Sequence, residues 1–423
     1  MQEDFLHYLW KHKKLDVLNL VTTNFESVEI LSVGQHNQNS GPDFFNAKLR
    51  IADQLWAGNV EIHLKSSDWF IHNHETDKAY DNVILHIVWE HDTDVFRKDN
   101  SKLPTLVLKD FVAETAIMNY KNLTNNSKKW INCESDFGEV DDFIIQNWLE
   151  RLYLERLEKK SVVIEELLKK SNNNWEAVLF KLLAKNFGLN VNGDAFFSLA
   201  NSIDFSIIRK LHSNEKQLEA LLFGQADLLN DTIEEPYYSY LQKEYAFLKQ
   251  KFEITNQGVL PFKFFRLRPM NFPTIRISQL AMLYHVHHNF FSELINLNSL
   301  KEFHQLFSIT TSEFWNSHYT FNKSSKFSKK TISKSFIDLL LINTIIPIKY
   351  CYEKYNGKDN HENILKLIQG IKPEKNSIVD KFESLKPVSN SALQSQALLE
   401  LKSTYCDKNK CLQCAIGNTV LSF

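Results

Sequence analysis

Two kinds of hydrophobic periodicity divide the chain. Over roughly the first 110 residues, apolar positions alternate with polar ones or form short runs, as is typical of β-strands. This pattern predicts a short amphipathic helix over Asp4–Lys14, followed by strands over Val28–Val33, Phe44–Ile51, Leu55–Lys65, Val83–Trp89 and Thr105–Leu108. A short helix is predicted over His74–Tyr80. Because a tight connection at Asp53-Gln54 joins the second and third strands, we expect these two strands to form a hairpin.

From about residue 140 the apolar positions recur every three or four residues, which predicts helices. The predicted helices begin near Asp142, Trp175, Glu215, Tyr237 and Ile277. The most apolar run, 336–348, contains Asp338 and Pro347 and is too short to span a bilayer, so it is predicted to be a buried helix. We therefore expect an α+β protein with a mixed-sheet α/β core over 1–112, a linker over 113–140 and a helical domain over 141–423.

Composition narrows the class of protein. The chain of 423 residues is 43% hydrophobic and 24% charged, which is enough apolar material for large cores and argues against disorder. A net charge of -2 argues against a protein that coats nucleic acid non-specifically, although it leaves room for a local basic groove. The first residues, MQEDFLHYLWKHKK, do not form a secretory signal. We therefore expect a cytoplasmic protein without a membrane segment; its oligomeric state is not indicated.

A cluster of polar side chains lies within the predicted strands. Along Leu55–Lys65 the two-residue period places Glu61, His63 and Lys65 on one face. Asp43 begins the neighbouring strand, and a hairpin brings the start of one strand beside the end of the next. The sequence therefore predicts that Asp43 approaches this polar face.

Such a set suits metal-assisted hydrolysis. Two carboxylates, Asp43 and Glu61, supply the hard oxygen ligands that Mg²⁺ or Mn²⁺ prefers. The metal polarises a phosphoryl oxygen and lowers the pKa of an attacking water. Lys65 or His63 can assist that water or stabilise the developing charge.

The order of elements, the Pro-Asp pair and the acidic third strand resemble the core of the PD-(D/E)xK nuclease superfamily. The resemblance covers about 80 residues and rests on a short motif. It implies that Asp43 and Glu61 bind a divalent metal and that the protein cleaves nucleic acid. His63 stands where the family has Lys, and Lys65 follows two residues later. This departure supports an alternative, in which a nuclease-like fold has lost activity and serves as a nucleic-acid or protein binding module.

Nearly the whole chain also resembles an uncharacterised bacterial family of unknown function. That resemblance rests on the segments GPDF, GNVEIHLKSSDW, HNH and NFPTIR and on the cysteines near the C-terminus. It is more specific than the nuclease resemblance, but it implies no mechanism.

A histidine-rich segment offers a second kind of site. His72, His74 and Asp77 form H-x-H-x-x-D, which can ligate Zn²⁺, and His86 and Asp68 can join them. This pattern predicts a zinc-dependent hydrolase without nuclease ancestry. The structural alternative is that these histidines only satisfy hydrogen bonds within the fold.

Three of the five cysteines, Cys406, Cys411 and Cys414, lie within nine residues. Without an export signal, clustered thiols point to a metal rather than to disulfides. The spacing C-x4-C-x2-C predicts a zinc ion or an iron–sulfur cluster, with Cys133 as the preferred fourth ligand and Cys351 as the alternate. Some nucleases of the same superfamily carry an iron–sulfur cluster on one upstream and three downstream cysteines. The alternative is that these residues are free buried thiols.

A basic segment interrupts the helical pattern between Phe262 and Arg276, where Pro269 and Pro273 break any helix. Its cations alternate with phenylalanines, which suits phosphate contacts and base stacking. We expect nucleic acid as a partner through the four cations Lys263, Arg266, Arg268 and Arg276. The alternative is that these cations pair with acidic residues inside the protein.

Overall fold

The computed structural model describes residues 1–422 except 38, 125–128 and 359–360. The chain forms two compact units. Unit 1 contains residues 1–148, 381–388 and 400–423, and unit 2 contains 149–380 and 389–399. The cysteine-containing C-terminus thus belongs with the N-terminal sheet, whereas we had grouped it with the helices over 141–423. Part of the predicted linker, 125–128, lies outside the described residues.

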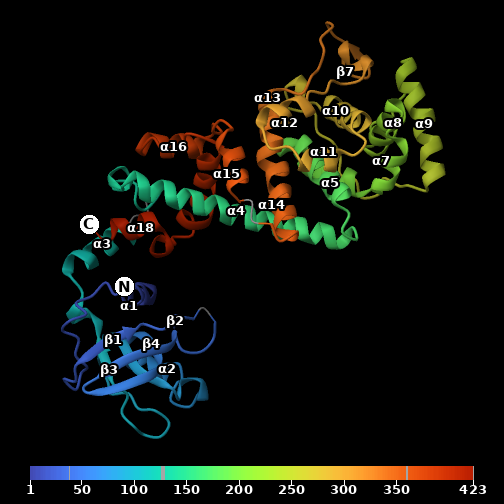
Figure 1. Cartoon of the computed structure of the whole chain (residues 1–423). Helices are drawn as coiled ribbons and strands as arrows, with labels where there is room; N and C mark the ends of the chain where they lie inside the picture. The colour runs from blue at the N-terminus through green and yellow to red at the C-terminus, as the bar shows by residue number, and fades with distance from the viewer. Residues whose placement is uncertain (38, 125–128, 359–360, 423) are drawn as a thin grey trace. The chain divides into compact units, whose positions relative to one another are not determined.

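Unit 1 is built around a mixed sheet (Figure 1). Its strands are β1 (Val28–Ser32), β2 (Gln35–His36), β3 (Phe44–Ile51), β4 (Gln54–Lys65), β5 (Val83–Glu90) and β6 (Thr105–Val107). The sheet order is β1-β3-β4-β5-β6, and β2 pairs with β3. The pairs β1–β3 and β3–β4 are antiparallel, whereas β4–β5 and β5–β6 are parallel. The predicted strands and the α+β class are confirmed.

The centre of the sheet is buried on both faces. Val60 and Ile62 of β4 are fully buried, and the polar Glu61 and His63 that alternate with them are also buried. Helix α1 (Glu3–Lys11) packs against β4, and its Trp10 indole N–H donates to the Val33 carbonyl at 3.1 Å. The polar face of β4 is therefore an interior surface rather than a solvated one.

The connection between β4 and β5 differs from the prediction. A helical turn, α2 (Asp68–Ile71), precedes His72, and only η1 (Lys78–Tyr80) is helical within the range predicted as a helix. Asp92 fixes the beginning of this connection because its carboxylate accepts from the Ser66 hydroxyl at 2.9 Å and the Ser67 hydroxyl at 2.7 Å. The prediction of a helix over His74–Tyr80 was therefore wrong for most of its length.

The rest of unit 1 consists of short helices and the beginning of a long one. These are η2 (Leu108–Phe111), α3 (Glu114–Thr124), η3 (Phe137–Glu139), the first turns of α4 (Asp142–Lys170), the π-helical η7 (Leu401–Cys406), η8 (Cys411–Gln413) and α18 (Ala415–Val420). The C-terminal segment contacts α1, and the Lys14 ammonium donates to the Ser422 hydroxyl at 3.1 Å.

Unit 2 is almost entirely helical (Figure 1). Its helices include the remainder of α4, α5 (Trp175–Phe187), α6 (Leu189–Asn201), α7 (Phe205–Leu211), α8 (Glu215–Gln225), α9 (Pro236–Phe252), α10 (Pro273–Val286), α11 (Phe290–Ile295), α12 (Leu300–Leu306), α15 (His361–Gln369), α16 (Ser377–Leu385, which crosses into unit 1) and α17 (Ala392–Glu400). Short elements connect them: η4 (Pro269–Asn271), η5 (Glu313–Asn316) and the hairpin of β7 (His318–Thr320) and β8 (Lys323–Ser324).

The most apolar run forms consecutive helical elements in unit 2. They are α13 (Lys334–Leu340), the π-helical η6 (Leu341–Ile345) and α14 (Ile346–Tyr355). Among the described residues, this is the one helix long and apolar enough to cross a membrane, but 72% of its most apolar window is buried inside the protein. Such burial is typical of a core helix.

Candidate metal centre

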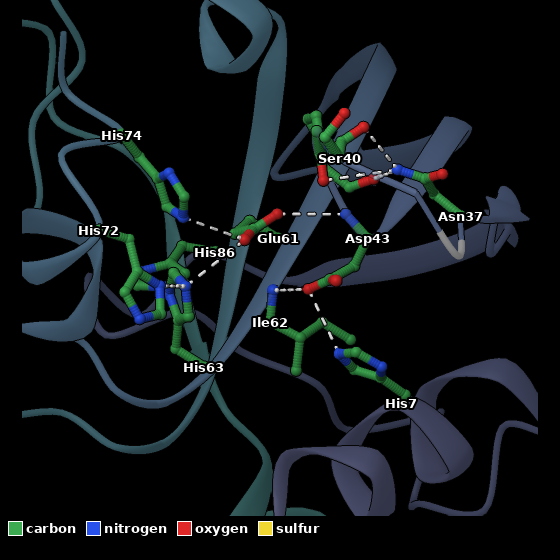
Figure 2. A network of polar contacts seen from close by, with 12 residues as sticks. His7, Asn37, Ser40, Asp43, Glu61, Ile62, His63, His72, His74 and His86 are labelled. Carbon is green, nitrogen blue, oxygen red and sulfur yellow. Dashed lines mark hydrogen bonds and ion pairs between the residues drawn. The ribbon is translucent and has the colours of Figure 1, made fainter. Parts of the chain in front are cut away.

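The Asp43 and Glu61 carboxylates each accept a backbone hydrogen bond from the other's segment, across the antiparallel pair of β3 and β4. Phe44 of β3 lies opposite Val60 of β4, so each carboxylate reaches the backbone of the other strand. The Asp43 N–H donates to Glu61 Oε2 at 3.1 Å, and the Ile62 N–H donates to Asp43 Oδ2 at 2.9 Å (Figure 2). The hairpin thus brings together the two carboxylates that the sequence had singled out.

The loop before Asp43 is organised by one side chain that sequence reasoning missed. The Asn37 amide donates to four consecutive carbonyls, those of Asn39, Ser40, Gly41 and Pro42, at 3.0–3.4 Å. Gly41 has φ of +102°, a conformation that L side chains rarely adopt. The GPDF segment therefore has a geometric role, because it sets the position from which Asp43 enters β3.

Three histidines converge beside Glu61 (Figure 2). One potential ligand atom from each of His63, His72 and His74 lies within 4.8 Å of the others. His72 Nδ1 is 3.1 Å from His63 Nε2, and Glu61 Oε1 is 3.4 Å from His63 Nε2 and 3.3 Å from His74 Nε2. Three imidazoles and a carboxylate thus share one small volume.

Local structure explains how a short segment supplies two of these imidazoles. His72 is the C-cap of α2, and the His74 N–H donates to the Trp69 carbonyl at 3.0 Å. Asn73 between them has φ of +58°, which Asn tolerates better than most residues. The Tyr80 ring stacks on the His74 ring with a centroid distance of 3.7 Å and fixes the plane of that imidazole.

A fourth histidine, His86, contacts the other ring nitrogen of His63, Nδ1. β4 and β5 are parallel with Glu61 opposite His86, and His86 Nε2 lies 2.9 Å from His63 Nδ1. His86 is fully buried. If His63 Nδ1 carries the proton, its Nε2 lone pair points toward His72 and Glu61, which is how a supporting group orients a metal ligand.

Burial decides the charge state of this cluster. Burial, reinforced by the neighbouring imidazoles, lowers the pKa of His63 to about 3, and burial lowers the pKa of His74 as well. Burial, with the Asp43 carboxylate adding to it, raises the pKa of Glu61 to about 9. At neutral pH His63 and His74 are therefore neutral, which is the form that ligates a metal, and a nearby cation would favour ionised Glu61.

The donor set fits a transition metal. Zinc bonds to nitrogen at about 2.0–2.1 Å, so ligand atoms around a tetrahedral ion are about 3.4 Å apart. Among the three imidazoles, His63 Nε2 and His72 Nδ1 are 3.1 Å apart, and every pair of ligand atoms lies within 4.8 Å. Glu61 Oε1 lies 3.3 Å from His74 Nε2 and 3.4 Å from His63 Nε2. His74 Nε2 is buried and makes no hydrogen bond. Imidazole donors favour zinc and related metals over Mg²⁺.

Other predicted residues lie outside the cluster. Lys65 is exposed, and its backbone N–H donates to Asp68 Oδ2 at 2.9 Å, so the Asp68 carboxylate binds the end of β4 rather than joining the histidines. Asp77 accepts from the Ala79 N–H at the start of η1. His7 of α1, which sequence reasoning missed, lies 3.3 Å from Asp43 Oδ2 through its Nε2. Only its place on an amphipathic helix could have drawn attention to it.

Solvent reaches the cluster from two sides. His72 is exposed, and the side chains of His7 and Asp43 keep 20% and 22% of their surface, whereas those of Glu61 and His63 keep 6% and 2%. A separate cavity of about 510 Å³ in unit 1 lies between α1, the 110–116 segment and the C-terminus, and none of its lining residues belongs to the cluster.

The predicted cysteine ligands gather in unit 1, with one exception. Cys133 interacts electrostatically with Cys406, Cys411 and Cys414, whereas Cys351 is buried in unit 2 against the Ser161 carbonyl. All five are free thiols.

The basic segment divides into exposed and buried cations. Lys263, Arg266 and Arg268 are exposed, and Arg266 lies over the exposed Phe265 ring. Arg276, by contrast, is buried in α10, where its guanidinium donates to Gln279 at 2.8 Å and Asn271 at 2.7 Å. A guanidinium in that position supports the fold and does not face a phosphate backbone.

The chain belongs to a family of proteins described as "Protein of unknown function (DUF2851)", whose model matches residues 3–377. This confirms the whole-chain resemblance. No curated protein and no solved structure matches the chain significantly.

Proposed function

For this member of the DUF2851 family we propose a metal-dependent hydrolase whose ion, zinc in the first instance, is bound by His63, His72 and His74. The observation that carries the proposal is the convergence of three imidazoles within 4.8 Å beside a buried carboxylate. Three protein ligands with a position left for water are typical of catalytic zinc sites. When bound, such an ion lowers the pKa of its water and polarises the substrate.

The surrounding residues supply the other functions that hydrolysis needs. Glu61 Oε1 lies 3.3 Å from His74 Nε2, beside the ligand atoms, where it can accept the proton of the attacking water. Burial alone would lower the pKa of His7, but the Asp43 carboxylate outweighs it and raises that pKa, so His7 is suited to donate a proton. His7 and Asp43 keep contact with solvent, which gives a substrate access.

The experiment is a hydrolysis assay on the full chain loaded in turn with Zn²⁺, Mn²⁺ and Mg²⁺. Substrates are a chromogenic phosphodiester, a chromogenic carboxylic ester, and labelled single- and double-stranded DNA and RNA. We expect hydrolysis with zinc or manganese, and its fall to the uncatalysed background in His72→Ala and His74→Ala. His12→Ala is the matched control because His12 is exposed at the end of α1. Equal activity in all three variants would refute the proposal.

A second candidate is Mg²⁺-dependent cleavage of nucleic acid through Asp43 and Glu61. It is supported by their reciprocal hydrogen bonds at 3.1 and 2.9 Å, which hold two carboxylates side by side on adjacent strands. In the same assay it predicts cleavage of DNA or RNA with Mg²⁺ that is lost in Asp43→Asn but kept in His72→Ala. If metal-loaded protein hydrolyses nothing yet binds nucleic acid, the non-catalytic binding module replaces both proposals.

A further inference from the structure

Four of the five cysteines gather at one place in unit 1, although more than 270 residues separate the first from the others. Every pair among them interacts electrostatically. Cys133 and Cys414 are buried, and Cys406 and Cys411 are half-buried. No disulfide joins them. Four reduced thiols in one partly buried volume need a cation when they ionise, because thiolates repel one another.

N–H groups point at two of the sulfurs. The backbone N–H groups of Ile416 and Gly417 donate to the Cys414 sulfur, and the Asn132 amide donates to the Cys411 sulfur at 3.4 Å. Such bonds stabilise a thiolate more than a thiol and are typical of thiolates that bind a metal. A Cβ on Gly417 would lie 2.2 Å from the Cys411 carbonyl, so only glycine allows the turn that brings Cys411 and Cys414 together.

The spacing of the sulfurs distinguishes between the two metals that the sequence allows. Four thiolates on one zinc ion, with bonds of about 2.3 Å, would be about 3.8 Å apart. Among the residues that the structure describes, only the histidine set has three or more ligand atoms within 4.8 Å of one another, so no three of these sulfurs are that close. A cubane cluster spreads its four thiolates over four irons and therefore holds them farther apart.

We propose that a [4Fe–4S] cluster binds to the four thiolates of Cys133, Cys406, Cys411 and Cys414. Each thiol gives up its proton as its Fe–S bond forms, while two ferric ions, two ferrous ions and four sulfide ions supply the rest of the cluster, so no further oxidant is needed. The cluster ties the segment around Cys133 to the C-terminal segment, which contacts α1. Its role is to hold unit 1 together, and it does not depend on the hydrolase proposal.

The experiment is anaerobic purification of the full chain, followed by incubation with iron and sulfide under reducing conditions and by desalting. We expect about four irons and four sulfides per chain, with broad visible absorption. X-ray absorption at the iron edge should show iron neighbours as well as sulfur, a readout on the unmodified chain that does not depend on whether variants fold. Loss of the cluster should lower the Tm of unit 1.

Cys133→Ser and Cys411→Ser should bind substoichiometric iron. Cys351→Ser is the matched control and should keep the full complement, because Cys351 is buried in unit 2. Zinc that resists exchange for iron and is lost in Cys411→Ser would overturn the cluster assignment. A folded chain that binds neither iron nor such cysteine-dependent zinc would overturn the site altogether. Zinc that stays in Cys411→Ser belongs to the histidine site and bears on neither outcome.

Discussion

His63 lies between His86 and His72, and its contacts with them explain why a buried strand carries a polar residue there. One ring nitrogen lies 2.9 Å from His86 and the other 3.1 Å from His72. Burial lowers its pKa to about 3, so the ring stays neutral and keeps one lone pair available. A histidine kept only for packing would need neither a supporting imidazole nor a second one facing it.

Removing the supporting imidazole should weaken metal binding while leaving the ligands in place. We predict that His86→Ala lowers zinc affinity about 10–100-fold, which is typical for loss of such a partner. His86→Gln should restore part of that affinity because its side-chain oxygen can accept from the His63 N–H. Competition with a chromophoric chelator measures the affinity. A purely structural role for His86 would lower thermal stability in both variants without separating their affinities.

Glu219 in unit 2 provides a pH-dependent test that is independent of the metal. It is fully buried and accepts hydrogen bonds from Tyr237 and, at 2.9 Å, from Ser312. Burial raises its pKa from 4.5 to about 7, because the hydrogen bonds offset only part of the desolvation. Above pH 4.5 the unfolded chain loses this proton while the folded chain keeps it until about pH 7, so the stability of unit 2 falls as pH rises through that window.

We therefore predict that wild-type protein loses about 3 kcal/mol of unfolding free energy, relative to Glu219→Gln, between pH 4.5 and 7. Urea denaturation of both proteins across this range measures the difference. Glu215→Gln, a half-buried position in the first turn of the same helix, should follow the wild type. A pH-independent difference between wild type and Glu219→Gln would show that Glu219 does not keep its proton in the folded state.

At the scale of elements, the strands were predictable and their surroundings were not. The alternation along β4 predicted that Glu61 and His63 share a face, and the hairpin predicted that Asp43 lies nearby. What covers that face could not be predicted, because α1 and the segment carrying His72 reach it through contacts between separate elements. The same alternation placed Lys65 on the face of Glu61 and His63 and made it a candidate catalytic residue. Lys65 is the last residue of β4, however, and its side chain is exposed.

Close packing of β4 against the connection to β5 should depend on one glycine. A Cβ on Gly58 would lie 2.5 Å from Ile84 Cγ2 and 2.6 Å from the Asn82 carbonyl. We predict that Gly58→Ala destabilises the protein by about 1–3 kcal/mol and weakens zinc binding, because β4 and β5 carry Glu61, His63 and His86. Gly138→Ala is the control, since its Cβ would meet only ordinary contact at 3.5 Å. Thermal unfolding with and without zinc compares them, and equal Tm values would contradict the packing argument.

At the scale of the whole molecule, the candidate metal sites and the basic segment lie in different compact units. Both candidate metal sites lie in unit 1, whereas the exposed basic segment and Glu219 lie in unit 2. The sequence could not assign the C-terminal cysteines to unit 1, because nothing in their spacing indicates which core they join.

Metal binding should therefore protect one unit selectively. We predict that zinc slows hydrogen exchange in peptides covering 54–90, where β4, α2 and β5 carry the histidines, and leaves peptides covering 205–252 unchanged. Exchange followed by mass spectrometry, on wild type and on His74→Ala, measures this. Protection of similar size in both units, or protection that persists in His74→Ala, would mean that zinc binds elsewhere.

The most direct test of the central claim is the zinc content of the protein. Metal-free chain would be equilibrated with zinc, desalted and analysed by inductively coupled plasma mass spectrometry, beside His72→Ala/His74→Ala and Cys411→Ser. The histidine site predicts about one zinc per chain in wild type, its retention in Cys411→Ser and its loss in the double histidine variant. Folded wild type that retains no zinc, or a double histidine variant that retains as much as wild type, would contradict the claim.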